Sequence, residues 1–231
     1  MLRTPVKMVA AALAAGAVLT ACGPVKLGAA ALMNNDRISA STLSAEVANL
    51  NANYQKYKGQ VQLQFEVSQM PQEVLSWLIR FRVGDEMAVR NGITVTPGQV
   101  DAEQQKLQQQ ASQSTTTGAA VPLNVLAVAN GLPPDMIPDL ARYQAIQNVL
   151  INRLDGGTIP TAPSDQQAIG RQLSKYECRA AKSLDIRVNP QWGQLDYAQY
   201  SVIAKPSTLS AEASPSPSPS PSSSVQLTPP C

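Results

Sequence analysis

The stretch "EVLSWLIRFRVGDEMAVRNG", from Glu73 to Gly92, decides the fold that the sequence predicts. Pro71 suits the first turn of a helix, where its missing N–H leaves no bond unmade, and Gly92 suits the end of that helix. Because apolar residues recur at helical spacing on two faces, we expect other elements to cover this helix from several sides. One face holds Val74, Trp77, Leu78, Phe81, Gly84 and Ala88, and the other holds Leu75, Ile79, Val83 and Met87.

Two short strands and a helix are expected before this stretch. The residues "AALMNNDRIS", from Ala30 to Ser39, predict strands that meet at a turn of Asn35-Asp36. Asn and Asp tolerate the positive φ that tight hairpins need. Ser41 or Thr42 can then cap a helix that runs to about Tyr57.

The segments that follow predict a mostly helical chain. "VQLQFEV", from Val61 to Val67, alternates like a strand, although a loop or a helical extension fits it equally. Thr96 and Pro97 predict the start of a polar helix. Further helices are expected up to Gly131, from Pro133 to about Leu154, and from Ser164 to Leu184.

The end of the folded part predicts more extended chain. In "DIRVNPQWGQLDYAQYSVIA", from Asp185 to Ala204, a turn at Asn189-Pro190 separates two extended segments. We expect the first to pair with the opening hairpin, with Trp192 and Tyr197 packing the seam. The predicted fold class is therefore mainly α, with a small β-sheet formed by the N-terminal hairpin and the C-terminal strand, over residues 29–204.

The first residues have the pattern of a secretory signal. Arg3 and Lys7 precede a short apolar run, and small residues lead up to Cys22 in "LTAC". This stretch resembles the bacterial lipobox, in which the cysteine becomes the lipidated first residue of the mature protein. The alternative is a stray cysteine at an ordinary signal site. We expect a signal peptide at 1–21, a lipidated tether at 22–28, and acyl chains that hold the protein at the extracytoplasmic face of the cell membrane.

Residues 205–231 predict a disordered tail rich in Ser and Pro. Its "SPSPSPSPSSS", from Ser214 to Ser224, favours polyproline II and cannot build a core. The tail can serve as a spacer, a site of sugar attachment, a peptide ligand, or a solvated tail without a partner. Cys178 falls off the apolar face of its predicted helix, so we expect it to be reachable. Cys178 and Cys231 then either form a disulfide that pins the tail to the body or remain two independent thiols.

Composition excludes several kinds of chemistry. The sequence contains no His, so it can build neither a Ser-His-Asp triad nor a His-ligated metal site. It has no nucleotide-binding glycine pattern, and a formal net charge of +2 gives no electrostatic case for nucleic acid. Asp135 and Asp139 lie one helical turn apart, which is more typical of a solvated helix edge than of acid–base catalysis. We expect no catalytic residue, no metal and no cofactor.

Three stretches, in their order and spacing, resemble the N-terminal chaperone domain of the SurA and PrsA families of extracytoplasmic foldases. They are "AALMNNDRISASTLSAEVANL" from Ala30, "LSWLIRFRVGDEMAVRNGITVTPGQVDAE" from Leu75, and "VNPQWGQLDY" from Val188. Full-length members carry a parvulin-type prolyl isomerase domain before the closing strand. Only "DGGTIPTAPSDQQ", from Asp155, occupies that place here, so the resemblance implies a chaperone-like domain without the isomerase. The lipobox and tail resemble an actinobacterial lipoprotein variant.

This resemblance implies an ATP-independent binder of unfolded secreted polypeptides near the membrane. Such a binder needs an apolar groove that tolerates many sequences, and Met and aromatic side chains suit that task. A structural or accessory envelope lipoprotein that docks one partner is the second hypothesis, and an atypical peptidyl-prolyl isomerase is the third. Core packing is an alternative role for Trp77 and Phe81. The candidate client contacts are Met70, Trp77, Phe81, Met87 and Trp192.

The lipobox makes the first testable prediction. Replacing the acylated residue, Cys22→Ala, should release the protein from membranes, because two or more acyl chains are needed for durable anchoring. Fractionation of cells that express the wild type and the variant measures this directly. Unchanged retention of the variant in the membrane fraction would contradict the assignment.

Overall fold

The computed structural model describes residues 28–34, 36–113, 115–116, 119–156 and 163–204. The predicted signal peptide, the acylated Cys22 and the Ser-Pro tail lie outside these residues. The described part is mainly helical with small antiparallel sheets, so the predicted fold class is confirmed. Its helices are α1 (Ala40–Tyr57), α2 (Met70–Arg90), α3 (Pro97–Gln113), α4 (Leu123–Ala129), α5 (Ile137–Leu154) and α6 (Pro163–Leu184), with short 3₁₀ helices η1 (Val67–Gln69) and η2 (Pro134–Met136). Its strands are β1 (Ala29–Met33), β2 (Asp36–Ser39), β3 (Thr115–Thr116), β4 (Ala119–Ala120), β5 (Ile186–Val188), β6 (Gln194–Asp196) and β7 (Ser201–Ile203).

The strand β1 lies in the middle of a three-stranded sheet with the order β2-β1-β5. β1 and β2 form the predicted hairpin. The predicted turn at Asn35-Asp36 is wrong by one residue, because Asp36 already pairs with Met33 in β2 and Asn34 takes the left-handed φ, of 47°. β5 pairs antiparallel with the other edge of β1. Asn189 extends this seam, because its backbone N–H donates to the Ala30 carbonyl at 2.9 Å and its side-chain amide donates to the Ala29 carbonyl at 3.1 Å. The predicted pairing of the two ends of the domain is therefore confirmed.

Helix α1 begins earlier than the sequence predicts. Ser39 is its N-cap, and the Ser39 Oγ accepts a hydrogen bond from the backbone N–H of Thr42 at 2.9 Å. The prediction of Ser41 or Thr42 as the cap is wrong, because the extended backbone of β2 ends at Ser39 and the helix follows without a linker. The helix ends at Tyr57, as predicted.

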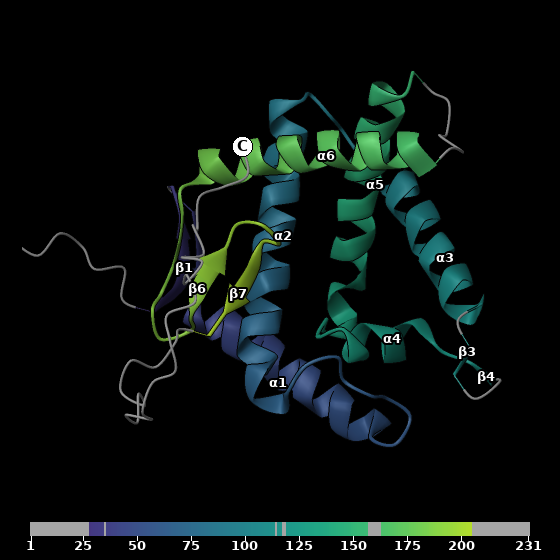
Figure 1. Cartoon of the computed structure of the whole chain (residues 1–231). Helices are drawn as coiled ribbons and strands as arrows, with labels where there is room; N and C mark the ends of the chain where they lie inside the picture. The colour runs from purple at the N-terminus through teal and green to yellow at the C-terminus, as the bar shows by residue number, and fades with distance from the viewer. Residues whose placement is uncertain (1–27, 35, 114, 117–118, 157–162, 205–231) are drawn as a thin grey trace, which may run out of the picture.

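Helix α2 is the central element of the fold. Figure 1 shows it between the small sheets and α5, with α6 across one end and α1 at the other, and it contacts each of these elements. Both of its predicted apolar faces contribute to the core, which confirms that it packs from several sides. The side chains that are at most 1% exposed are Val74, Leu75, Ile79, Val83 and Met87.

Helices α2 and α5 approach each other closely because Gly84 has no side chain. A Cβ atom on Gly84 would lie 2.4 Å from Cδ2 of the Tyr143 ring on α5. The Tyr143 hydroxyl donates to Glu177 Oε1 on α6 at 2.8 Å, and Gln147 Nε2 donates to the same oxygen at 2.8 Å. Burial and the Glu177 carboxylate raise the pKa of Tyr143, so its hydroxyl remains a donor. One tyrosine thus joins three helices.

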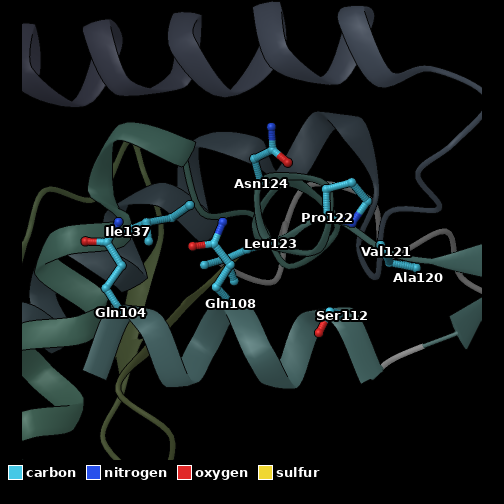
Figure 2. Close-up of a pocket in the computed structure, with 9 residues that line it drawn as sticks. All are labelled: Gln104, Gln108, Ser112, Ala120, Val121, Pro122, Leu123, Asn124 and Ile137. Atoms are coloured by element: carbon cyan, nitrogen blue, oxygen red, sulfur yellow. The ribbon is translucent and has the colours of Figure 1, made fainter. Parts of the chain in front are cut away.

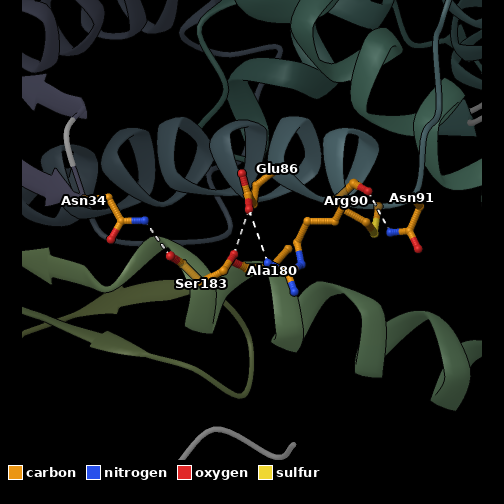
Figure 3. A network of polar contacts seen from close by, with 7 residues as sticks. Asn34, Glu86, Arg90, Asn91, Ala180 and Ser183 are labelled. Atoms are coloured by element: carbon orange, nitrogen blue, oxygen red, sulfur yellow. Dashed lines mark hydrogen bonds and ion pairs between the residues drawn. The ribbon is translucent and has the colours of Figure 1, made fainter.

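A polar network ties the first hairpin to α2 and α6 (Figure 3). The Ser183 Oγ donates to Glu86 Oε1 at 2.8 Å, and the Ser183 carbonyl accepts from the Asn34 amide at 2.5 Å. Arg90 Nη1 lies 3.7 Å from the same Glu86 oxygen. These contacts fix the C-terminal end of α6 where the chain turns into β5.

A second hairpin, β6–β7, packs on α2 after the closing strand. The Val202 N–H donates to Ser76 Oγ at 2.7 Å, and this hydroxyl donates to the Gln72 carbonyl at 2.6 Å. Arg80 Nη2 reaches the Gln199 carbonyl at 3.2 Å. The sequence predicts extended chain here, but not a separate hairpin that closes on itself.

The segment from Val61 to Val67 contains no strand. It makes one isolated bridge, between Val61 and Lys58, and Val67 opens η1. Alternating side chains alone do not make a strand when no sheet edge lies within reach. Of the three interpretations that the sequence allows, a loop is the one that the structure has.

The expectation that Cys178 is reachable is wrong. Cys178 is 1% exposed, because it lies on the buried side of α6 together with Ala180 and Ala181. Cys178 is disulfide-bonded, and its partner lies outside the described residues. Cys231, the other half of the predicted disulfide, also lies outside them, so that pairing stays a prediction.

The close approach at Gly84 predicts the effect of one added methyl group. Gly84→Ala should lower the free energy of unfolding by about 1–3 kcal/mol, because the Tyr143 ring must move. Gly170→Ala is the matched control, since no atom lies within 4 Å of its added Cβ on α6. The control should gain about 0.5–1 kcal/mol from helix propensity. Urea unfolding measures both, and equal stabilities of the two variants would contradict the packing argument.

Candidate functional site

An apolar groove opens between the first half of α1 and the start of α2. Its volume is about 430 Å³. No side chain that lines it carries a charge. The lining consists of Leu43, Ser44, Val47, Ala48 and Asn51 from α1, Val67, Ser68, Met70 and Pro71 from the entry to α2, and Trp192.

The two helical walls of the groove follow from local sequence. Leu43 and Val47 lie one turn apart on α1, and Leu43 is fully buried while Val47 is only half-buried. On the opposite wall, Gln69 Oε1 accepts a hydrogen bond from the Glu66 N–H at 3.1 Å, which closes η1 as a capped turn. This turn holds Val67 with 51% of its surface exposed.

Trp192 closes the third side of the groove. The turn that follows β5 places it there, because the Trp192 N–H donates to the Asn189 carbonyl at 2.9 Å. Gly193 comes next with a φ of 130°, and a Cβ there would lie 2.3 Å from the Ile203 carbonyl oxygen. The ring is half-buried, and its buried Nε1 has no hydrogen-bond partner among the described residues. An unpaired buried donor costs about 1–3 kcal/mol, so stability alone does not explain an indole here.

The structure brings together two of the five predicted client contacts. Met70 and Trp192 both line the groove, although Met70 is 3% exposed and presents little of its surface. Trp77 and Phe81 lie farther along α2 in a separate apolar cluster with α4 and η2. Their rings are 5.9 Å apart between centroids, and Trp77 Nε1 donates to the Asn130 carbonyl at 3.0 Å. Met87 is fully buried in the main core.

Sequence reasoning misses the aliphatic part of the groove. Val47 occupies a helical position that predicts core contact, and Val67 ends a segment that alternates like a strand. Neither pattern indicates that an open space faces the side chain. Val67 is nevertheless one of the most exposed large apolar residues in the described part of the chain.

Two other hollows are more polar. One, of about 420 Å³, lies between α3 and α4, and Figure 2 shows Gln108 rising from α3 towards Leu123 and Gln104 towards Ile137. The other, of about 480 Å³, lies among α3, α5 and α6, and Lys106, Asn148 and Asn152 are among its lining residues. Amide side chains in both favour water over apolar ligands, so the groove beside Trp192 is the better site for an apolar segment.

A group of carboxyl groups lies where α1 meets η2 and α5. Burial raises the pKa of Glu46, and the charges of Asp135 and Asp139 raise it further. Burial also raises the pKa of Asp139, with Asp85 adding to the effect. Asp135 and Asp139 are nevertheless both exposed, as expected for a solvated helix edge. Asn49 Nδ2 donates to Asp135 Oδ2 at 2.5 Å. Among the described residues, no nucleophilic side chain contacts these carboxyl groups.

In the described ranges, no three His, Cys, Asp or Glu side chains are placed to hold a metal ion. No helix there is long and apolar enough to cross a membrane. No protein-family model matches the chain, and no curated protein or solved structure matches it either. The resemblance to the SurA and PrsA chaperone domain therefore stays a prediction.

The unpaired indole nitrogen yields a prediction for Trp192. Trp192→Phe keeps most of the apolar ring and removes the unpaired donor, so the free energy of unfolding should change by less than about 1 kcal/mol. Trp192→Ala also removes the ring and should cost about 2 kcal/mol or more. Urea unfolding distinguishes the two. A Phe variant as unstable as the Ala variant would show that the indole N–H makes a stabilising bond.

Proposed function

We propose that the protein is a membrane-anchored, extracytoplasmic binder of unfolded secreted polypeptides that acts without ATP. The groove beside Trp192 is its binding site in this proposal. The observation that supports it best is an open, wholly uncharged apolar groove on a domain whose other large apolar side chains are mostly buried. Exposed apolar surface of this kind commonly marks a site of interaction.

The chemistry of the groove suits many different sequences. Val47 and Val67 offer apolar contact without a shaped pocket, and Met70 can adapt its unbranched side chain. Ser44, Ser68 and Asn51 add hydroxyl and amide groups that can bond to the backbone of any extended chain. An uncharged lining discriminates little between acidic and basic clients, and promiscuous binding requires this.

The size of the groove suits short segments. About 430 Å³ is near the lower end of the roughly 300–1,000 Å³ typical of ligand pockets. It accommodates a few apolar side chains rather than a folded partner. Binding of this kind is weak for each segment and readily reversed, so a client can leave when it folds.

The proposed lipid anchor would keep this site near the bilayer. The tether from Cys22 to Gly28 has seven residues, which span at most about 25 Å when fully extended. The tether leads directly into β1, which pairs with β5. The turn that holds Trp192 follows β5 in the sequence. Secreted chains that emerge from the membrane would then meet the groove early.

A matched pair of valines tests this function. Val67 is 51% exposed in the groove, and Val89 is 76% exposed near the far end of α2. Val67→Asp should weaken binding of a fluorescent, reduced and carboxymethylated polypeptide about tenfold, a loss of about 1.4 kcal/mol. Val89→Asp should leave the affinity unchanged, and neither exposed change should unfold the domain.

Three results would contradict the proposal. These are failure of the wild type to bind the unfolded polypeptide, equal weakening by both variants, and unchanged binding by both. A wild type that ignores unfolded chains but crosslinks to one envelope protein would instead favour the accessory lipoprotein. Faster isomerisation of an X-Pro peptide would favour the third hypothesis.

A further inference from the structure

We propose that the chain's own Ser-Pro run, residues 214–221, binds in the groove beside Trp192 and competes there with other polypeptides. The competition rests on the function proposed above, whereas the binding of the tail rests only on the groove and on the course of the chain. This occupant is favoured by three features: where the described chain ends, what the tail consists of, and how long it is.

The described chain ends beside the groove. In the β6–β7 hairpin, Gln194 pairs with Ile203 and Leu195 pairs with Val202. The same register places Ala204, the last described residue, opposite Gly193, which directly follows Trp192 in the sequence. The absent side chain of Gly193 allows this approach, since a Cβ there would lie 2.3 Å from the Ile203 carbonyl oxygen. The tail therefore starts next to the aromatic wall of the groove.

Exposed apolar side chains mark both the groove and the strand from which the tail departs. Only Val67, Val89 and Ile203 are large apolar side chains counted as exposed in the described residues. Val67 lines the groove, and Ile203, 39% exposed, belongs to the strand from which the tail departs. A tail that covered Val67 and Ile203 would remove their apolar surface from water, and such burial is favourable.

The composition of the tail matches the groove. Residues 213–231 contain no charged side chain, so binding to an uncharged lining leaves no charge desolvated. Prolines alternate with serines at Pro215, Pro217, Pro219 and Pro221, which favours polyproline II. Pro-rich segments in this conformation bind to aromatic-lined grooves because little conformational entropy is lost. Trp192 supplies the aromatic face.

The length of the tail permits the contact. The nine residues from Lys205 to Ala213 separate the hairpin from the Ser-Pro run. At roughly 3.1 Å per residue they reach about 28 Å when extended, and less when they bend back. A tether of this length gives the run an effective concentration in the millimolar range at the groove. Even a weak intramolecular contact is then substantially populated.

The regulatory consequence follows from mass action. A client can bind only those molecules whose groove is free, so its apparent dissociation constant rises as the free fraction falls. A client with strong apolar segments displaces the tail, and a weakly apolar or folded protein does not. The tail would thus set a threshold that restricts binding to the more unfolded chains.

The test uses the whole chain from residue 23 with two matched sets of tail substitutions. The first set is Pro215→Ala, Pro217→Ala, Pro219→Ala and Pro221→Ala, which removes the polyproline preference at constant length. The second is Ser216→Ala, Ser218→Ala, Ser220→Ala and Ser222→Ala, which keeps every proline. The sequence contains two Trp residues, so an indole N–H spectrum by NMR shows Trp192 together with Trp77 as an internal control.

The proline set should shift the Trp192 indole signal and leave the Trp77 signal in place. The serine set should leave both signals where the wild type has them. The proline set should also bind the unfolded polypeptide at least about twofold more tightly than the wild type does. An unmoved Trp192 signal in the proline set would overturn the proposal. So would a Trp192 signal that depends on protein concentration, because a second copy would then occupy the groove.

Failure of this inference is distinguishable from failure of the proposed function. If the Trp192 signal responds to the proline set but no variant binds unfolded chains, the tail occupies the groove and the client-binding function is wrong. If all variants bind unfolded chains equally and the Trp192 signal is unmoved, the client-binding function holds and the tail contact is wrong.

Discussion

The fold depends on the burial of α2 against elements on several of its sides. This helix contacts α1, α5, α6 and β7, and no pair of those elements forms a comparable core without it. A helix that packs against several elements places many of its charged side chains at the seams between those neighbours. Arg80 reaches the β6–β7 hairpin and Glu86 reaches α6 at such seams, where each finds a polar partner. The packing of α2 against several elements therefore determines both its two-faced apolar pattern and the positions of its charged side chains.

The sheet closes the chain around this helix. β1 and β5 are separated by almost the whole folded sequence, as in the hydrogen bond from Asn189 to Ala29 across 160 positions. Closing so long a loop has an entropic cost that three short strands offset poorly by themselves. The helices between them supply the burial, and polar contacts at Asn34 and Ser183 set the register. The strands therefore complete the fold that α2 organises.

Much of this architecture can be predicted from the sequence, and the predictions that are wrong have physical causes. The pattern around α2 and the polar turns that follow β1 and β5 are local signals for features that tertiary contacts preserve, although the first turn lies one residue earlier than predicted. The segment from Val61 to Val67 forms no strand, because alternating side chains predict a strand only where a partner edge exists. The prediction that Cys178 is reachable is wrong because the buried face of α6 is wider than its strict helical stripe and includes Ala180 and Ala181. Periodicity gives the direction of a side chain, but not the width of the surface that meets it.

The same limit explains why the groove is only partly predictable. Trp77, Phe81 and Met70 all lie on α2, yet α4 and η2 cover the first two, while Met70 belongs to the main core and also borders the groove. At the N-terminal end of α2 the surrounding elements are a capped 3₁₀ turn and the loop that holds Trp192. Neither fills the volume that a packed helix would fill, so Val47 and Val67 stay partly exposed beside a fully buried Leu43. The groove exists because the space between the first half of α1 and the start of α2 is bordered by a capped turn on one side and by the Trp192 loop on another, and no further helix packs into it.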